Sequence, residues 1–194
     1  MATPAPHNDI IIALAFAVSQ VGSNGQLKIR RCEDWRRGGQ NATAWAIDQP
    51  HHHTPDHYVA GGQLAKALAP DEDIIIWGHD HDGAYRQLAL EDPAQAYVML
   101  MTSLGPTLWS HNVLMFGAVA SVWAYNRIGD VLCALARILL LIPVQHYVDD
   151  YGAAEARTTA SDSFQKFVDF NELLGFLMKP SKAQKPAMAH KIQG

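Results

Sequence analysis

Two adjacent aspartates, Asp149 and Asp150, are the residues of this sequence whose type and spacing most directly indicate chemistry. The apolar residues 139–144 that lead toward them predict a buried strand. Small residues follow from Gly152, so we expect the two carboxylates at the tip of a β-hairpin. Like charges on a tight turn repel each other unless a cation neutralises them. Hard oxygen ligands suit Mg²⁺ or Mn²⁺ better than zinc.

A third carboxylate, Asp80, follows another predicted strand. Residues 73–79 are mostly β-branched or apolar, which indicates a core strand that ends at Asp80. If this strand neighbours the one that carries Asp149 and Asp150, the three carboxylates meet at one place. Three converging carboxylates can hold two divalent ions, which is the arrangement that phosphoryl and nucleotidyl transfer use.

The composition is that of a globular protein with one domain, or one domain and a small lobe. The 194 residues are 48% hydrophobic and 18% charged, which excludes a disordered chain. A net charge of −4 argues mildly against a nucleic-acid binder with a basic surface. The basic residues nevertheless gather toward the two ends, which suits a phosphate-bearing substrate held on both sides of metal ions: Lys28, Arg30, Arg31, Arg36, Arg37, Lys179, Lys182, Lys185 and Lys191.

The sequence predicts an intracellular protein, nuclear or cytoplasmic, without membrane contact. Cys32 and Cys133 are far apart and have no CxxC spacing, as expected of reduced thiols. Asp9 precedes the apolar residues 10–18 and no basic segment stands before them, so we expect no signal peptide. Residues 93–126 lack charged side chains, but glycine, proline and polar residues interrupt them too often for a membrane span.

The remaining elements predict an α+β domain with a mostly antiparallel sheet. Asn24 and Gly25 form the strongest short hairpin signal and lie between two predicted strands. Ser161 is the predicted N-cap of a final helix that runs through Leu177. The other expected elements are strands at residues 10–21, 26–32 and 97–101, a polar loop at 48–57, a helix at 59–68 and one long buried helix at 117–141.

Five segments, which follow one another along the chain in the family's order, resemble the motifs of retroelement (retrotransposon) reverse transcriptases. They cover about residues 24–194. Residues 147–150 match the family's Tyr-x-Asp-Asp (YxDD) box, and residues 80–85 match its first palm motif, an aspartate followed by Ala and an aromatic residue. The others are residues 28–36 with Asn41 (fingers segment), residues 116–121 (Phe-Gly-x-x-x-Ser) and residues 173–176 with Ser181 and Lys182 (fourth palm motif).

The resemblance implies an RNA-directed DNA polymerase that transfers deoxynucleotides to a primer 3′-hydroxyl on an RNA or DNA template. It implies a palm-type sheet packed on helices with a small fingers β-hairpin. Residues 1–70 would be a leader and partial fingers, and residues 71–194 a palm that ends before a thumb. Asp80, Asp149 and Asp150 would bind two Mg²⁺ (or Mn²⁺) ions. The residues that would contact the deoxynucleoside triphosphate are Lys28, Arg30, Tyr85, Phe116, Gly117, Ser121 and Lys182.

Three departures from the family pattern are visible. Met115 stands where the family often has proline, and Asp82 adds a carboxylate inside the first palm motif. The sequence ends at Gly194, where the family begins its primer-gripping hairpin. A truncated or inactive copy therefore stays open beside an active polymerase, since much of the affinity for a phosphate backbone comes from basic elements beyond this point.

Two alternatives from other classes remain open. Residues 80–84 resemble the Asp-x-Asp-Gly-Thr box of haloacid dehalogenase-type, magnesium-dependent phosphatases, with Asp80 as nucleophile and Asp82 as acid. That function needs a parallel sheet. The second alternative is a non-catalytic, nucleic-acid-binding remnant of the palm. The histidines at 51–53, 57, 79 and 81 invite a zinc site, but no spacing among them repeats a zinc signature.

Overall fold

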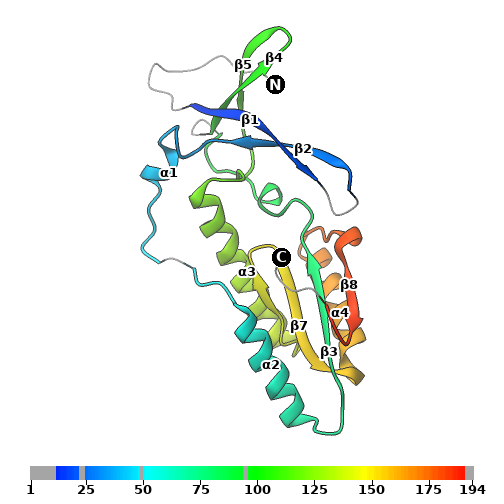
Figure 1. Ribbon diagram of the computed structural model, residues 1–194. Helices are drawn as coiled ribbons and strands as arrows, with labels where there is room; N and C mark the ends of the chain where they lie inside the picture. Colours follow the sequence, from blue (N-terminus) through cyan, green and yellow to red (C-terminus); the bar gives the residue numbers. More distant parts are fainter. Residues whose placement is uncertain (1–11, 22–24, 49, 94–95, 191–194) are drawn as a thin grey trace. The chain divides into compact units, whose positions relative to one another are not determined.

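Two sheets organise the part of the chain that the structure, a computed structural model, describes: residues 12–21, 25–48, 50–93 and 96–190 (Figure 1). The chain divides into two units, the first made of Met1–Asp48 and Leu88–Trp123, the second of Gln49–Gln87 and Ala124–Gly194. The described elements are β1 (Ile12–Val21), β2 (Leu27–Glu33), α1 (Gln40–Thr43), α2 (Pro55–Leu68), β3 (Ile74–Asp80), the 3-10 helix η1 (Ala84–Gln87), β4 (Tyr97–Thr102), β5 (Gly105–Ser110), α3 (Val119–Leu139), β6 (Gln145–Tyr147), β7 (Asp150–Ala156), α4 (Arg157–Leu173), the 3-10 helix η3 (Pro180–Lys182) and β8 (Gln184–Ala187).

The first unit is built on a four-stranded sheet in the order β2-β1-β4-β5. β1 pairs antiparallel with β2 and parallel with β4, and β4 pairs antiparallel with β5. The predicted strands are confirmed where the structure describes them; residues 10 and 11 and the turn at Asn24 lie outside the described residues. Sequence reasoning missed β5, because Pro106 interrupts the apolar pattern. An edge strand tolerates proline, since one side of it pairs with no neighbour.

The second unit is built on the sheet β6-β7-β3-β8, in which every pair of neighbours is antiparallel. The predicted strand that ends at Asp80 and the predicted hairpin around Asp149 are both confirmed, as β3 and as the β6–β7 pair. The chain therefore has the mixed α+β fold with mostly antiparallel sheets that the sequence predicted. The phosphatase alternative requires a parallel sheet, whereas the sheet that carries Asp80 is antiparallel.

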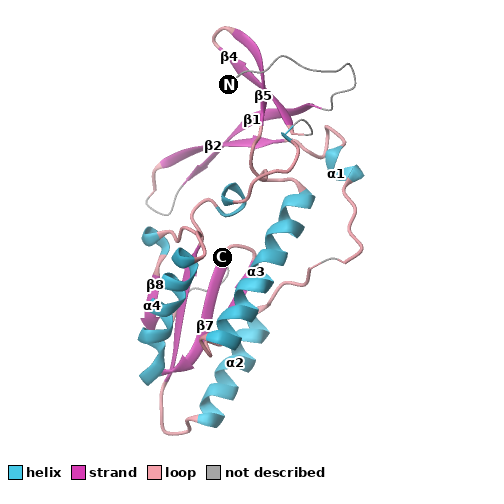
Figure 2. Ribbon diagram, turned by 180° about the vertical axis from the view of Figure 1, so that it is seen from behind, coloured by secondary structure: helices cyan, strands magenta, loops and turns pink. Residues whose placement is uncertain are grey.

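The two faces of this second sheet differ, because alternate residues of a strand point to opposite faces. Ile75, Trp77 and Tyr151 pack with residues of α3 and α4 into the main core of the unit. The opposite face carries Asp80 and Asp150 and is partly covered by α2. Figures 1 and 2 show α2, α3 and α4 beside the strands of this sheet.

α2 lies close to the strands that it covers, and Gly152 of β7 makes room for its Tyr58. A Cβ on Gly62 would stand 3.6 Å from Cβ of Ala154, and one on Gly152 would stand 3.3 Å from Cε1 of Tyr58. The helix therefore rests on the same face as the carboxylates, further along the strands.

The predicted strand at residues 139–144 is wrong. α3 continues to Leu139, and Leu141 then takes a left-handed φ of 58° that ends the helix. The amide of Ile142 donates to the carbonyl oxygen of Ala136 over 3.2 Å, which closes the chain back onto the last turn of the helix. Pairing with β7 begins only at Gln145, so the strand that leads into the aspartates is short.

Two predicted helix starts are also wrong, because each helix is capped several residues earlier than the sequence predicted. α2 begins at Pro55, where Thr54 and His57 form a reciprocal capping box, so the expected polar loop is shorter. α4 begins at Arg157, and the carboxylate of Glu72 accepts a hydrogen bond from the amide of Thr158 over 3.0 Å. The predicted cap at Ser161 is therefore an exposed residue inside α4, and the helix ends at Leu173, before Leu177.

The long helix α3 differs from its prediction in extent and in burial. It begins at Val119, since Gly117 has a φ of 85° that a helix does not allow. One side of it faces outward, with Val131 and Ile138 exposed. Within the described ranges, every helix is too short or too polar to serve as a membrane-spanning segment.

Candidate active site

Strand pairing brings the three candidate catalytic aspartates to one end of the second sheet. Asp80 is the last residue of β3 and lies directly opposite Asp150, the first residue of β7. The amide of His81 donates to the carbonyl oxygen of Asp149 over 3.3 Å, which ties the end of β3 to the β6–β7 turn. Asp80 is buried, whereas Asp149 and Asp150 are half-buried. The placement follows from the register alone and needs no unusual backbone in β3.

The turn that presents Asp149 is strained. Val148 and Asp149 connect β6 to β7, and Val148 has a φ of 56°. This left-handed conformation is unfavourable for a β-branched residue, because its Cβ substituents crowd the backbone. Such strain persists only where the surrounding structure holds it.

The carboxylates repel one another in a partly dehydrated place. Burial raises the pKa of Asp149, and the neighbouring Asp80 raises it further. Burial, together with the charges of Asp80 and Asp149, raises the pKa of Asp150 to about 6. The site therefore carries more negative charge than its surroundings neutralise.

Lys182, at the end of η3, supplies a nearby positive charge. Its Nζ donates to Oδ2 of Asp80, and this hydrogen bond raises the pKa of the lysine. Asp82, the additional carboxylate, forms a separate and exposed ion pair with Lys179 at 3.2 Å. Asp82 thus has its own counter-ion.

The donor chemistry of the three aspartates fits a hard divalent cation such as Mg²⁺ or Mn²⁺, because all their ligand atoms are carboxylate oxygens and their charge is incompletely neutralised. In the structure, Asp80 is paired with the ammonium group of Lys182. Among the described residues, no group of three or more His, Cys, Asp or Glu side chains is arranged to hold a metal ion, and this statement includes the histidines considered for zinc. The hydrogen bond from Lys182 therefore engages an Asp80 oxygen that a metal ion would need as a ligand.

A cavity of about 370 Å³ adjoins the carboxylates within the second unit. Asp80, Asp150 and Lys182 line it together with Gly152 and Tyr58. A Cβ on Gly152 would lie 2.6 Å from the carbonyl oxygen of Trp77, so only glycine fits there without displacing the strands. The cavity therefore runs from the carboxylates along the face of the sheet that α2 partly covers.

Tyr85 lies in η1 and is 7% exposed. Its ring meets that of Tyr125 edge to face, with the centroids 5.3 Å apart. Burial, and to a lesser degree the charge of Asp149, raises the pKa of the phenol to about 12, so the hydroxyl stays neutral at physiological pH.

The other predicted nucleotide-binding residues belong to the first unit. Lys28 and Arg30 lie exposed on β2. Phe116 is partly exposed, and its carbonyl oxygen accepts a hydrogen bond from Nε1 of the buried Trp35 over 3.0 Å. The first unit thus holds the fingers-like hairpin and the Phe-Gly segment, and the second unit holds the carboxylates with Lys182 and Tyr85.

Gly117 and Ser121 shape the start of α3. The side chain of Asn41 donates to the carbonyl oxygen of Gly117 and accepts from the amide of Val119, each over 3.0 Å. Oγ of Ser121, which is 1% exposed, accepts from the amide of Met115 over 3.0 Å. The asparagine that follows the fingers segment and the serine of the Phe-Gly motif therefore both have a structural role here.

Sequence reasoning missed one polar residue beside the aspartates. His146, directly before Tyr147 in the hairpin, is completely buried and hydrogen-bonded on both ring nitrogens. Its position next to the Tyr-x-Asp-Asp box was the available signal.

The fold is similar to that of a solved reverse transcriptase. The crystal structure of the prototype foamy virus protease–reverse transcriptase is similar to this chain, with a TM-score of 0.65 and 16% sequence identity. The similarity covers 93% of this chain, which spans about a fifth (21%) of the viral chain. No protein-family model matches the sequence, and no curated protein matches it either.

Proposed function

We propose that this chain provides the fingers and palm of an RNA-directed DNA polymerase, a nucleotidyltransferase that extends a primer on an RNA or DNA template. One observation carries the proposal: Asp80 lies opposite Asp150 across β3 and β7, with Asp149 in the adjoining turn. Three carboxylates at one end of an antiparallel sheet can serve as the ligands of two metal ions in phosphoryl transfer. The reverse transcriptase fold supports the same class.

Asp80, Asp149 and Asp150 would hold Mg²⁺ or Mn²⁺, two ions in all. Bound there, the ions supply Lewis-acid activation of the primer 3′-hydroxyl and neutralise charge that develops on the triphosphate. The protein would orient the ligands, because the β3–β7 register places the backbone of Asp80 opposite that of Asp150.

The remaining residues would act on the incoming deoxynucleoside triphosphate. The guanidinium of Arg30 can contact phosphate oxygens bidentately, with Lys28 beside it as a second charge. The ring of Tyr85 would exclude a sugar 2′-hydroxyl, and Gly117 with Phe116 would border the nucleotide. Lys182, once released from Asp80, would place its ammonium group near the pyrophosphate leaving group.

The test is deoxynucleotide incorporation on a primed RNA template with Mg²⁺ or Mn²⁺, with wild type and Asp149→Asn side by side. We expect the wild type to extend the primer and the variant to extend nothing, since the amide removes a ligand charge and almost no volume. Asp162→Asn makes the same change at an exposed position of α4 and serves as the matched control.

Each outcome has a clear meaning. Incorporation that survives in Asp149→Asn would contradict the assignment of the aspartates. No incorporation by a folded wild-type protein would contradict the proposal for this chain, and retained binding to the primed template would then favour the non-catalytic remnant.

A further inference from the structure

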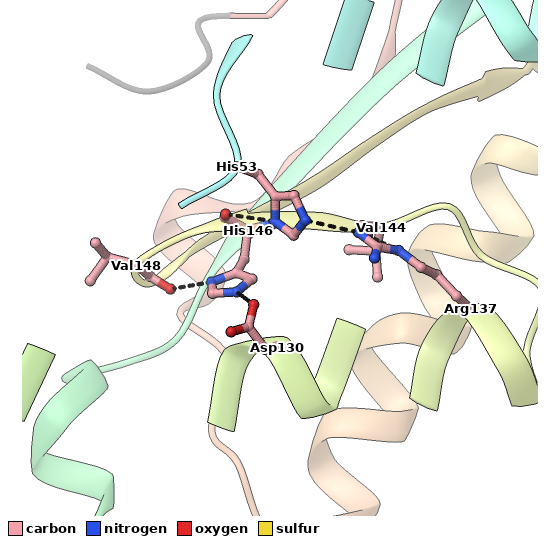
Figure 3. A network of polar contacts seen from close by, with 6 residues as sticks. All are labelled: His53, Asp130, Arg137, Val144, His146 and Val148. Carbon is pink, nitrogen blue, oxygen red and sulfur yellow. Dashed lines mark hydrogen bonds and ion pairs between the residues drawn. The ribbon is translucent and has the colours of Figure 1, made fainter. Parts of the chain in front are cut away.

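His146 of β6 connects the strained turn to helix α3. Its ring is completely buried. Nε2 lies 3.0 Å from Oδ1 of Asp130, and Nδ1 lies 3.2 Å from the carbonyl oxygen of Val148 (Figure 3). One side chain thus bridges α3 and the residue with the left-handed φ of 56°.

Both neighbours of the ring are acceptors. A carboxylate oxygen and a peptide carbonyl oxygen carry no proton to donate, so each bond requires a hydrogen on the imidazole nitrogen that faces it. A neutral imidazole has one such hydrogen. His146 can therefore satisfy Asp130 and Val148 together only as an imidazolium cation, with the Asp130 carboxylate as its counter-ion.

Packing gives the ring no other position. A Cβ on Gly129 of α3 would stand 2.5 Å from Cε1 and 2.7 Å from Nδ1 of His146, so the helix backbone lies directly against the ring. On its other side the ring stacks on Tyr151, with the centroids 5.6 Å apart and the planes inclined by 23°. These contacts on the ring hold the bridge beside Val148.

The other ionisable groups around the ring leave Asp130 as its charged partner. Burial lowers the pKa of His53, and the nearby His146 lowers it further. His53 is then neutral: its Nδ1–H donates to the carbonyl oxygen of His146 over 3.1 Å, and its Nε2 accepts from Arg137 over 3.3 Å. Directly after β3, burial lowers the pKa of His81 to about 4, so it is also neutral. Tyr151, on β7, is a neutral phenol because burial raises its pKa.

We propose that His146 is a positioning residue: as a buried imidazolium held by Asp130, it fixes the Val148 carbonyl, and with it the backbone from which Asp149 projects. The inference rests on the proposed function for its catalytic consequence, whereas the charge state of the ring does not. Because the bridge touches the turn and no substrate, its loss should lower kcat and leave the KM of the deoxynucleotide nearly unchanged.

The first test reads the ring directly, by nitrogen-15 NMR of the histidine side chains in the wild-type protein at neutral pH. We expect hydrogens on both nitrogens of His146, and on only one in Asp130→Asn, where the counter-ion is gone. Asp162→Asn, on the surface of α4, should leave the His146 signals unchanged. A single ring hydrogen in the wild type would overturn the proposal whether or not the protein is a polymerase.

The second test measures incorporation kinetics. We expect Asp130→Asn to lower kcat by about 10- to 100-fold, as is usual when a group that orients a ligand residue is removed. His146→Gln keeps a donor for the Val148 carbonyl, so it should retain more activity than His146→Leu. Equal losses in the Gln and Leu variants, or a change confined to KM, would overturn the positioning role. An inactive wild type would contradict the proposed function instead, and the NMR result would still decide the state of the ring.

Discussion

Lys182 sets the charge of the carboxylate site at the scale of single residues. Its ammonium group donates to Oδ2 of Asp80, the most buried of the three aspartates. A divalent cation that approaches Asp80 must displace this lysine, so the same residue that stabilises the free site opposes metal binding. If the cation binds, the lysine is released next to the position proposed for the triphosphate.

We therefore expect Lys182→Gln to bind Mn²⁺ more tightly than the wild type and to incorporate nucleotides more slowly. The pair is partly exposed, and such pairs are worth about 0.5–1 kcal/mol, so the dissociation constant should fall by about 2- to 5-fold. Mn²⁺ binding is followed by electron paramagnetic resonance. Lys185→Gln, on the neighbouring strand β8, is the control that should change nothing; unchanged affinity in Lys182→Gln would mean that the lysine does not compete with the ion.

Asp150 should make the stability of the metal-free protein depend on pH. Its pKa is about 6 in the folded protein against an ordinary value of 3.8, so between these values the folded state binds more protons than the unfolded state. The free energy of unfolding must then fall as pH rises from about 4 through about 6. Mg²⁺ should oppose this loss, because it stabilises the ionised carboxylates.

Urea unfolding at several pH values, with and without Mg²⁺, measures this effect. Asp150→Asn should remove most of the fall, since the amide does not titrate. A difference between wild type and variant that stays constant from pH 4 to 7 would show that Asp150 is not responsible.

At the scale of elements, the close contact between α3 and β6 depends on Gly129. We expect Gly129→Ala to destabilise the protein, because the added methyl group meets a completely buried His146 ring that has no room to move. Overpacking of this kind costs about 1–3 kcal/mol and should exceed the gain of up to about 1 kcal/mol in helix propensity.

Gly62→Ala, in α2, is the matched control for this change. Its Cβ would meet neighbours at ordinary distances of 3.6 and 3.7 Å, so it should raise the free energy of unfolding by up to about 1 kcal/mol. Thermal and urea unfolding of the two variants decide between these outcomes. Destabilisation of similar size in both variants would show that the contact with His146 is not the cause of the loss in Gly129→Ala.

Elements with a strong local pattern could be predicted from the sequence. The β-branched run of β3 and the hairpin around Asp149 need only neighbouring residues. The approach of Asp80 to Asp150 was predicted only on the condition that the two strands are neighbours, which the pairing of β3 with β7 fulfils. A long-range contact sets one of the element boundaries that were wrong: Glu72 caps α4 across 86 residues of sequence. The bridge of His146 could not be predicted from the local pattern either, since its partner Asp130 and the space left by Gly129 belong to helix α3.

At the scale of the whole molecule, the two units have hydrophobic cores of different size. Among the described residues, the main core of the second unit contains twelve buried residues, including Trp77 and Phe167, whereas that of the first contains four, of which Trp35 is the only large one. Burial of apolar surface is the dominant favourable contribution to folding, and local opening requires less free energy where less of it is buried. The sheet of the first unit should therefore open more readily than the sheet that carries the aspartates.

Native-state hydrogen exchange, read by mass spectrometry at increasing urea, tests this difference. We expect peptides from β1 and β2 to exchange at lower urea and with a smaller opening free energy than peptides from β3 and β7. Mg²⁺ should raise the protection of β3 and β7, whose ends carry Asp80 and Asp150, more than that of β1 and β2. If all four strands exchange through one transition with the same opening free energy, the chain unfolds as a single cooperative body, and core size does not separate the stabilities of its two units.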